Sequence, residues 1–205
     1  MRRILCFGDS NTWGFEPGTG RRYGPDVRWS GLLQRKLQAS AVVIEEGLNG
    51  RAAVYPDLIS GRSSAQPYLS DCLASHAPLD LVILMLGTND MKARFGLGAY
   101  DIAEGVGALV DAVKNSHAGA EDGSPDILIV CPAPIEKLVD HRVDLFAGAE
   151  EKSASLDGHL MRVAEARGVR ALPIRDHVRP SPVDGIHLDI AAHAVLAQLI
   201  ADAIG

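Results

Sequence analysis

Five short runs of apolar residues recur along the chain, separated by segments in which apolar residues have helical spacing. The runs are apolar at consecutive positions, where a half-exposed strand would alternate. This pattern predicts strands that are covered on both faces, as in a parallel sheet. The five predicted strands are Ile4–Phe7, Val42–Ile44, Leu81–Leu86, Ile127–Cys131 and Val169–Ile174.

The intervening segments predict amphipathic helices, because their apolar residues return every three or four positions. These helical segments are Leu32–Leu37, Leu69–His76, Ile102–Val113, Leu156–Val163 and Val195–Ile204. Strand alternating with helix predicts an α/β fold, a three-layer α/β/α domain with a flavodoxin-like, parallel five-stranded sheet. Such sheets bind their ligands at the carboxyl ends of the strands, so we expect the chemistry there.

Three long segments rich in Gly, Pro, Asp or Ser are predicted as loops, namely 15–28, 51–66 and 132–149. The first and the third follow a predicted strand or the turn after it, so we expect them to shape a pocket over the crevice. The chain has neither a linker-like stretch nor an internal repeat. With 205 residues, of which 47% are apolar and 22% charged, residues 1–205 form a single predicted domain, and disorder is excluded.

Charge and cysteine content narrow the function classes. The 20 basic and 26 acidic residues give a net charge of −6, which predicts neither a nucleic-acid partner nor an anionic membrane surface. No apolar run approaches the ~18 residues of a membrane helix, and the first run is too short for a signal peptide, so we expect a cytoplasmic protein. Cys6, Cys72 and Cys131 are odd in number and widely spaced, which predicts buried thiols.

Three polar motifs follow predicted strands or precede the closing helix. In the first, Ser10 lies in Gly-Asp-Ser directly after the first strand, where its hydroxyl can project into the crevice. In the second, Gly87-Thr-Asn89-Asp, the Asn89 amide can donate to a developing oxyanion. In the third, Asp184-Gly-Ile-His187, a carboxylate can hold an imidazole in one tautomer, as a general base requires. Each motif alone is also typical of an ordinary turn. All three, however, are predicted to lie at the same crevice.

Two further pairs of residues have a spacing that metal sites use. Cys72 and His76, and likewise Asp189 and His193, are four residues apart on predicted helices. Two ligands without nearby partners indicate helix packing, so no metal site is predicted.

Together these blocks resemble the SGNH hydrolases, also called the GDSL esterase/lipase family, over nearly the whole chain. The family's Gly block is similar to residues 47–51, and the resemblance implies a second backbone donor at Gly50, with Gly47 as a nearby competitor. Asn11 stands where the family name has Leu, which affects pocket detail and not the reaction. The resemblance implies the SGNH hydrolase fold.

The resemblance also implies roles. Ser10 is the expected nucleophile, His187 the base and Asp184 its orienting partner, while Ser10, Gly50 and Asn89 form the oxyanion hole; no metal or cofactor is required. Short bacterial arylesterases and acyltransferases of the family are often oligomeric and accept small acyl esters. We therefore expect a homo-oligomeric serine esterase that acts on small-molecule, acetyl-like esters, with acyl transfer to alcohols as a second reaction.

Several alternatives remain open. Within the family these are a carbohydrate acetylesterase, a thioesterase and a lysophospholipase. A non-catalytic, flavodoxin-like module for phosphorylated ligands is another class, although the first turn lacks the glycine pattern and the basic residue of a phosphate loop. Asn11 and Trp13 are expected at the substrate pocket, and Phe15 and Trp29 are further candidates for its apolar wall. For each aromatic residue the alternative is core packing.

Overall fold

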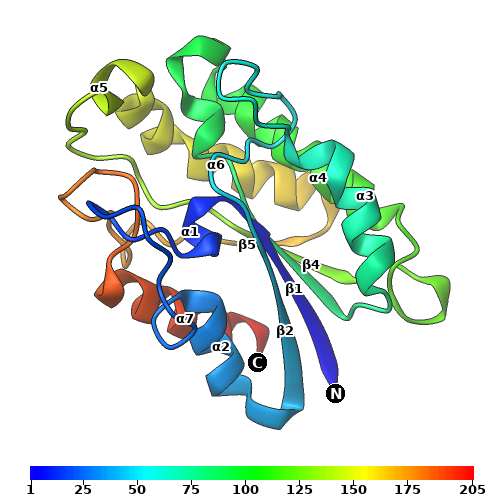
Figure 1. The fold of residues 1–205 in the computed structure, drawn as a ribbon. Coiled ribbons are helices and arrows are strands. Elements are labelled where there is room, and N and C mark those ends of the chain that lie inside the picture. The colour runs from blue at the N-terminus through cyan, green and yellow to red at the C-terminus, as the bar shows by residue number, and fades with distance from the viewer.

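The fold, described over all residues 1–205 of a computed structural model, is a parallel five-stranded sheet between two layers of helices (Figure 1). The strand order β2-β1-β3-β4-β5 is that of flavodoxin-like sheets and confirms the predicted fold class. The first strand therefore lies inside the sheet, and its carboxyl end is flanked by those of β2 and β3. The strands are β1 (Arg2–Gly8), β2 (Ala41–Gly47), β3 (Leu81–Met85), β4 (Asp126–Val130) and β5 (Arg170–Leu172).

Five longer helices cover the two faces of the sheet (Figure 1). One face packs against α2 (Trp29–Leu37) and α7 (Ile190–Ile204), and the other against α3 (Ala65–His76), α4 (Ala99–Lys114) and α6 (Ala149–Arg167). The short helices are α1 (Ser10–Trp13), α5 (Arg142–Leu145) and the single 3₁₀ turns η1 (Gln38–Ser40), η2 (Asn89–Met91), η3 (Ala93–Phe95) and η4 (Ala120–Asp122).

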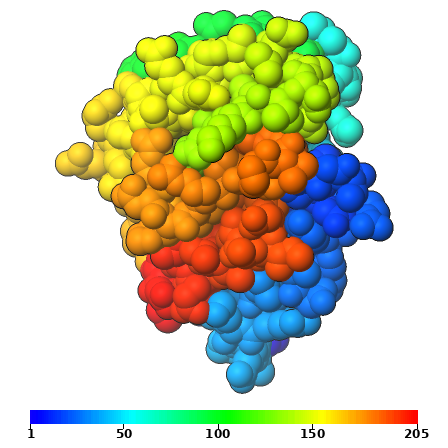
Figure 2. Space-filling model, turned by 90° about the vertical axis from the view of Figure 1, so that its left-hand side faces the viewer, coloured from blue at the N-terminus to red at the C-terminus, as the bar shows by residue number.

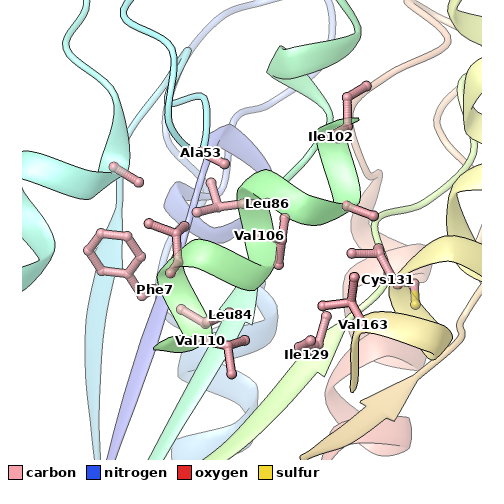
Figure 3. Close-up of a cluster of buried hydrophobic side chains, with 14 of the residues drawn as sticks. Phe7, Ala53, Leu84, Leu86, Ile102, Val106, Val110, Ile129, Cys131 and Val163 are labelled. Atoms are coloured by element: carbon pink, nitrogen blue, oxygen red, sulfur yellow. The ribbon is translucent and has the colours of Figure 1, made fainter. Parts of the chain in front are cut away.

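The core is split into two layers because successive strand residues point to opposite faces. On the face covered by α4, Phe7, Leu84 and Val106 pack in one cluster (Figure 3). On the other face Cys6 packs with Trp29 of α2, whose side chain is fully buried as the core-packing alternative requires. This double coverage explains why the strands are apolar at consecutive positions. All three cysteines are buried and unpaired, as expected.

Segments from both ends of the chain meet at the carboxyl edge of the sheet. Figure 2 shows the loop after β1 in contact with the segment that precedes α7. The first long loop contains a single antiparallel bridge, Phe15 to Arg22, and the third contains the short helix α5, which the sequence pattern did not predict. None of the helices combines the length and the apolarity that a bilayer crossing requires.

His193 couples α7 to α2 and makes stability depend on pH. Its Nδ1 accepts a hydrogen bond from the Trp29 backbone N–H at 3.3 Å, and its ring is fully buried. Burial, supplemented by the positive charge of Arg28, lowers the pKa of His193 to about 4. The unfolded chain therefore takes up a proton between about pH 6.5 and 4 that the folded chain does not, and stability falls as the pH falls through this window.

We expect His193→Gln to remove this dependence, because glutamine keeps an acceptor for Trp29 and does not titrate. Between pH 7 and pH 5 the wild-type protein should lose roughly 2 kcal/mol of unfolding free energy more than the variant does. Urea unfolding at the two pH values measures the difference. Asp90, whose pKa burial raises to about 7, contributes with the opposite sign in both proteins and cancels in this comparison. Parallel pH profiles for the two proteins would show that His193 does not carry the effect.

Candidate active site

Ser10 is positioned by the turn that ends β1. Asp9 caps α1, because its Oδ1 accepts a hydrogen bond from the Asn11 backbone N–H at 2.9 Å. A side chain at Gly47, at the end of β2, would collide with the backbone N of Trp13 at 2.2 Å, so this glycine lets α1 lie directly against β2. The turn leaves the Ser10 Oγ 3.0 Å from Nε2 of His187.

Asp184 orients the imidazole of His187 with both carboxylate oxygens. Its Oδ2 lies 2.7 Å from Nδ1 of His187, while its Oδ1 accepts the backbone N–H groups of Ile186 and His187 at 3.0 and 2.9 Å. Burial raises the pKa of the Asp184 carboxyl, but the hydrogen bonds and the charge of His187 lower it further, so that its pKa lies below the usual range. The carboxylate is therefore ionised and fixed at neutral pH.

The loop that carries these residues allows only glycine at position 185. Gly185 has a φ of +74°, and a Cβ there would lie 1.9 Å from the backbone oxygen of Glu136. The same loop is joined to the third long loop because the Glu136 N–H donates to the Gly185 carbonyl. The structure thus brings Ser10, Asp184 and His187 together as the sequence predicted.

Asn11 binds the loop that carries His187, here called the histidine loop, on both sides of that residue. Its Nδ2 donates to the Ile186 carbonyl at 3.3 Å, and its Oδ1 accepts the Leu188 backbone N–H at 3.0 Å. The side chain is almost completely buried, so no solvent can replace these bonds. Asn11 was expected at the substrate pocket, but its amide is occupied by the loop.

We expect Asn11→Ala to lower both stability and turnover, because it leaves a buried N–H and a buried carbonyl without partners. The loss of unfolding free energy should be about 2–4 kcal/mol, and kcat should fall roughly tenfold with little change in KM. Thermal unfolding and ester kinetics measure the two effects. Asn11→Asp keeps the acceptor for Leu188 but sets a second acceptor against the Ile186 carbonyl, so it should restore neither property. A lower melting temperature with unchanged kcat would indicate a purely structural role.

A cavity of about 210 Å³ opens at the Ser10 hydroxyl. Phe15 lines it, as proposed for an apolar wall, and its ring stacks on the His187 imidazole with centroids 4.1 Å apart. Trp13 does not line it; the guanidinium of Arg22 covers the Trp13 ring at 5.3 Å. The full lining is Ser10, Phe15, Asn49, Gly50, Thr88, Asn89, Lys92, His141, Arg142, Leu145, Phe146, Ile186 and His187.

The three expected oxyanion donors all lie on this cavity. Ser10, Gly50 and Asn89 line it, and the backbone N–H groups of Ser10 and Gly50 donate to no other group of the chain. The Asn89 Nδ2 lies 3.5 Å from Oδ2 of Asp9, which orients the amide. Gly47, the competing position, lies instead against α1.

Two buried carboxyl groups next to the site accept hydrogen bonds from backbone N–H groups. Asp90 accepts the Ala53 backbone N–H with both oxygens, at 2.9 and 3.1 Å, and Asp9 caps α1. Burial is the largest cause of the raised pKa of both groups. Neither lines the cavity, so their role is structural.

Outside the sequence motifs, sequence reasoning missed five lining residues: Lys92, His141, Arg142, Leu145 and Phe146. The last four belong to the third long loop, and that loop was expected at the pocket only as a whole. Without the helical turn of α5, no pattern of residues indicates which of its side chains face inward.

The helix pairs with metal-ligand spacing are explained by other contacts. Glu46 joins Cys72 and His76, but its carboxylate already bonds Nε2 of His76 and the Tyr68 hydroxyl, both at 3.1 Å. In the second pair, Asp189 caps α7 and His193 bonds Trp29. These contacts account for both pairs as packing and hydrogen bonding.

A serine, an imidazole and a carboxylate in one hydrogen-bonded row, beside unpaired N–H donors at the carboxyl edge of a parallel sheet, define the class of α/β serine hydrolases. The chain belongs to the GDSL-like lipase/acylhydrolase family, whose sequence profile matches residues 6–195, and it is an ester hydrolase. A comparison with curated protein sequences gives no match.

Solved structures agree in fold over the complete chain. A carbohydrate acetylesterase from Sinorhizobium meliloti is 37% identical with a TM-score of 0.96, and the match covers 100% of this chain and 98% of that one. The aryl esterase of M. smegmatis is 38% identical with a TM-score of 0.94 and the same coverage. A carbohydrate acetylesterase family member from Sinorhizobium meliloti is 33% identical with a TM-score of 0.94, over 100% of this chain and 97% of that one.

Proposed function

We propose that the protein hydrolyses small acyl esters through an acyl-enzyme on Ser10. The observation that carries the proposal is the row of hydrogen bonds from Ser10 through His187 to Asp184. The Ser10 Oγ attacks the ester carbonyl as its proton passes to Nε2 of His187, and the protonated imidazole then gives that proton to the departing alcohol. Water, activated by the same imidazole, attacks the acyl-enzyme and releases the carboxylic acid with Ser10 regenerated.

The oxyanion of each tetrahedral intermediate is assigned to the donors beside Ser10. The N–H groups of Ser10 and Gly50 are unpaired, and the Asn89 amide is held by Asp9 before any substrate arrives. Donors fixed in advance stabilise developing charge without reorganisation, which is the main advantage of a protein site over water. No metal or cofactor takes part in these steps.

The acyl group is proposed to be small and acetyl-like. The cavity of about 210 Å³ is short of the usual size range for drug-sized ligands, and the similar structures are those of an aryl esterase and carbohydrate acetylesterases. Phe15, stacked on His187, limits the approach of water to the acyl-enzyme. An alcohol that enters the cavity then competes with water, so acyl transfer accompanies hydrolysis.

Serine-directed labelling tests the proposal. One equivalent of an organophosphate should attach to Ser10 in the wild-type protein and none in Ser10→Ala. An aryl acetate assayed with and without added alcohol separates hydrolysis from transfer, and p-nitrophenyl esters of rising chain length and acetylated sugars define the substrate. Folded protein that takes up no label would support the alternative of a non-catalytic binding module.

A cytoplasmic location and a homo-oligomeric state belong to the same proposal, since the resemblance to short bacterial arylesterases implies assembly. Light scattering of the purified protein measures its mass against the 21.8 kDa of one chain. Cell fractionation tests the location.

A further inference from the structure

The wall of the active-site cavity carries positive charge and no carboxylate. Lys92 and Arg142 are among its lining residues, and no aspartate or glutamate is. The protein as a whole has a net charge of −6, so this cavity stands out against an acidic molecule. A cleft lined by one sign of charge concentrates ligands of the opposite sign.

Lys92 supplies a buried positive charge, and this charge has a counterion. Its Nζ lies 2.9 Å from Oδ2 of Asp57, and Arg94 lies 3.1 Å from Oδ1 of the same carboxylate. Burial raises the pKa of Asp57, but hydrogen bonds from Lys92 and Ser60 lower it far more, so that this carboxyl is ionised at every working pH. Lys92 and Arg94 thus share the single carboxylate of Asp57, so this carboxylate neutralises Lys92 only in part.

Arg142 supplies the part of this positive charge that has no counterion. It lies at the start of α5, is half-buried, and forms no ion pair and no side-chain hydrogen bond with the rest of the chain. The acidic residue of the same helix turn, Asp144, lines a neighbouring hollow together with Arg94 and His141. The planar guanidinium of Arg142 is therefore available to bind a carboxylate, for which its fork of donors is suited.

We propose that the substrates of this site are esters that carry a carboxylate, and that Arg142 selects them. The inference rests on the proposed function, since it names the class of ester that Ser10 attacks. The carboxylate binds Arg142 with Lys92 adding to the field, and the ester carbonyl meets Ser10 in the same cavity. The chemistry is unchanged: water and the ester give a carboxylic acid and an alcohol, and the recognised carboxylate takes no part.

Paired esters test the inference. 4-Acetoxybenzoate carries its charge on the alcohol side, and the mono-4-nitrophenyl ester of adipic acid carries it on the acyl side; each is compared with its neutral primary amide. The readout is the ratio of kcat/KM for the anionic ester to that for the neutral one. Because the ratio is compared between variants, differences in intrinsic reactivity cancel.

For at least one pair, Arg142→Gln should lower this ratio roughly five- to tenfold, and Arg142→Glu should lower it further. Arg142→Lys should retain most of it and guards against a folding defect. Arg35→Gln, which removes the same charge from the exposed surface of α2, should leave the ratio as in the wild type. Added salt should reduce the wild-type ratio.

Equal ratios for the wild type and Arg142→Gln in both pairs would overturn the inference while the esterase stands. If the wild type hydrolyses none of the four esters and Ser10 takes no organophosphate, the proposed function itself fails. The two failures are therefore distinguishable.

Discussion

Ser10→Ala is expected to reduce kcat for an aryl acetate by at least about 10⁴-fold, because no other group of the site can form the acyl-enzyme. The hydroxyl has one partner, Nε2 of His187, so replacing the CH₂OH group by methyl breaks no other hydrogen bond. The oxyanion donors are unchanged, so a slow attack by water on the bound ester should remain. Steady-state kinetics with burst analysis measure both features, since the burst of the acyl-enzyme should vanish.

Stability provides the control for this variant. The side chain of Ser10 is small and makes a single hydrogen bond, so the melting temperature should stay within a few degrees of the wild-type value. Retained turnover with a retained burst would mean that another nucleophile carries the reaction. That result would contradict the proposed mechanism.

Asp184→Asn is expected to lower kcat by roughly 10³–10⁴-fold with little loss of structure, the magnitude seen for this replacement in serine protease triads. The Oδ1 of the new amide can keep the two backbone N–H groups of Ile186 and His187, so its NH₂ must occupy the place of Oδ2. An NH₂ there donates to Nδ1 of His187, which forces the ring proton onto Nε2. His187 then donates to Ser10 and cannot take its proton.

The tautomer can be observed directly. Nitrogen chemical shifts of His187 should show a proton on Nδ1 in the wild type and on Nε2 in Asp184→Asn at neutral pH. Asp189→Asn is the matched control, because it removes the same charge from the cap of α7, outside the site, and kcat should change only a few-fold. A wild-type kcat in Asp184→Asn would rule out the proposed role of the carboxylate.

Much of this fold could be predicted because strands that are covered by helices on both faces are apolar at consecutive positions. The core strands β1, β3 and β4 are apolar on both faces, and all three predicted runs overlap the observed strands. Edge strands are less distinct: β2 continues through Glu45 and Glu46, which no apolar run could indicate. Their carboxylates are held by side chains from other elements, Arg28 and His76 among them.

The hydrogen-bonded centre was predictable for a different reason, since the carboxyl ends of parallel strands must share one edge. The Ser10 and Asn89 motifs directly follow such ends, and the Asp184–His187 motif lies in the loop between the last strand and the closing helix.

The pocket was not predictable. Asn11 faces the histidine loop because α1 turns each successive side chain by about 100° about its axis. Trp13 lies close to the helix face of Ser10, but Arg22 covers its ring. Only three-dimensional packing decides which residue of a short helix faces the ligand.

The placement of Ser10 at the end of the first strand and His187 just before the last helix has a consequence for biosynthesis. The imidazole can meet the hydroxyl only after the segment up to Leu188, which Asn11 binds, has been synthesised and has left the ribosome. A nascent chain that lacks this segment has the nucleophile without its base, so it cannot yet cleave esters.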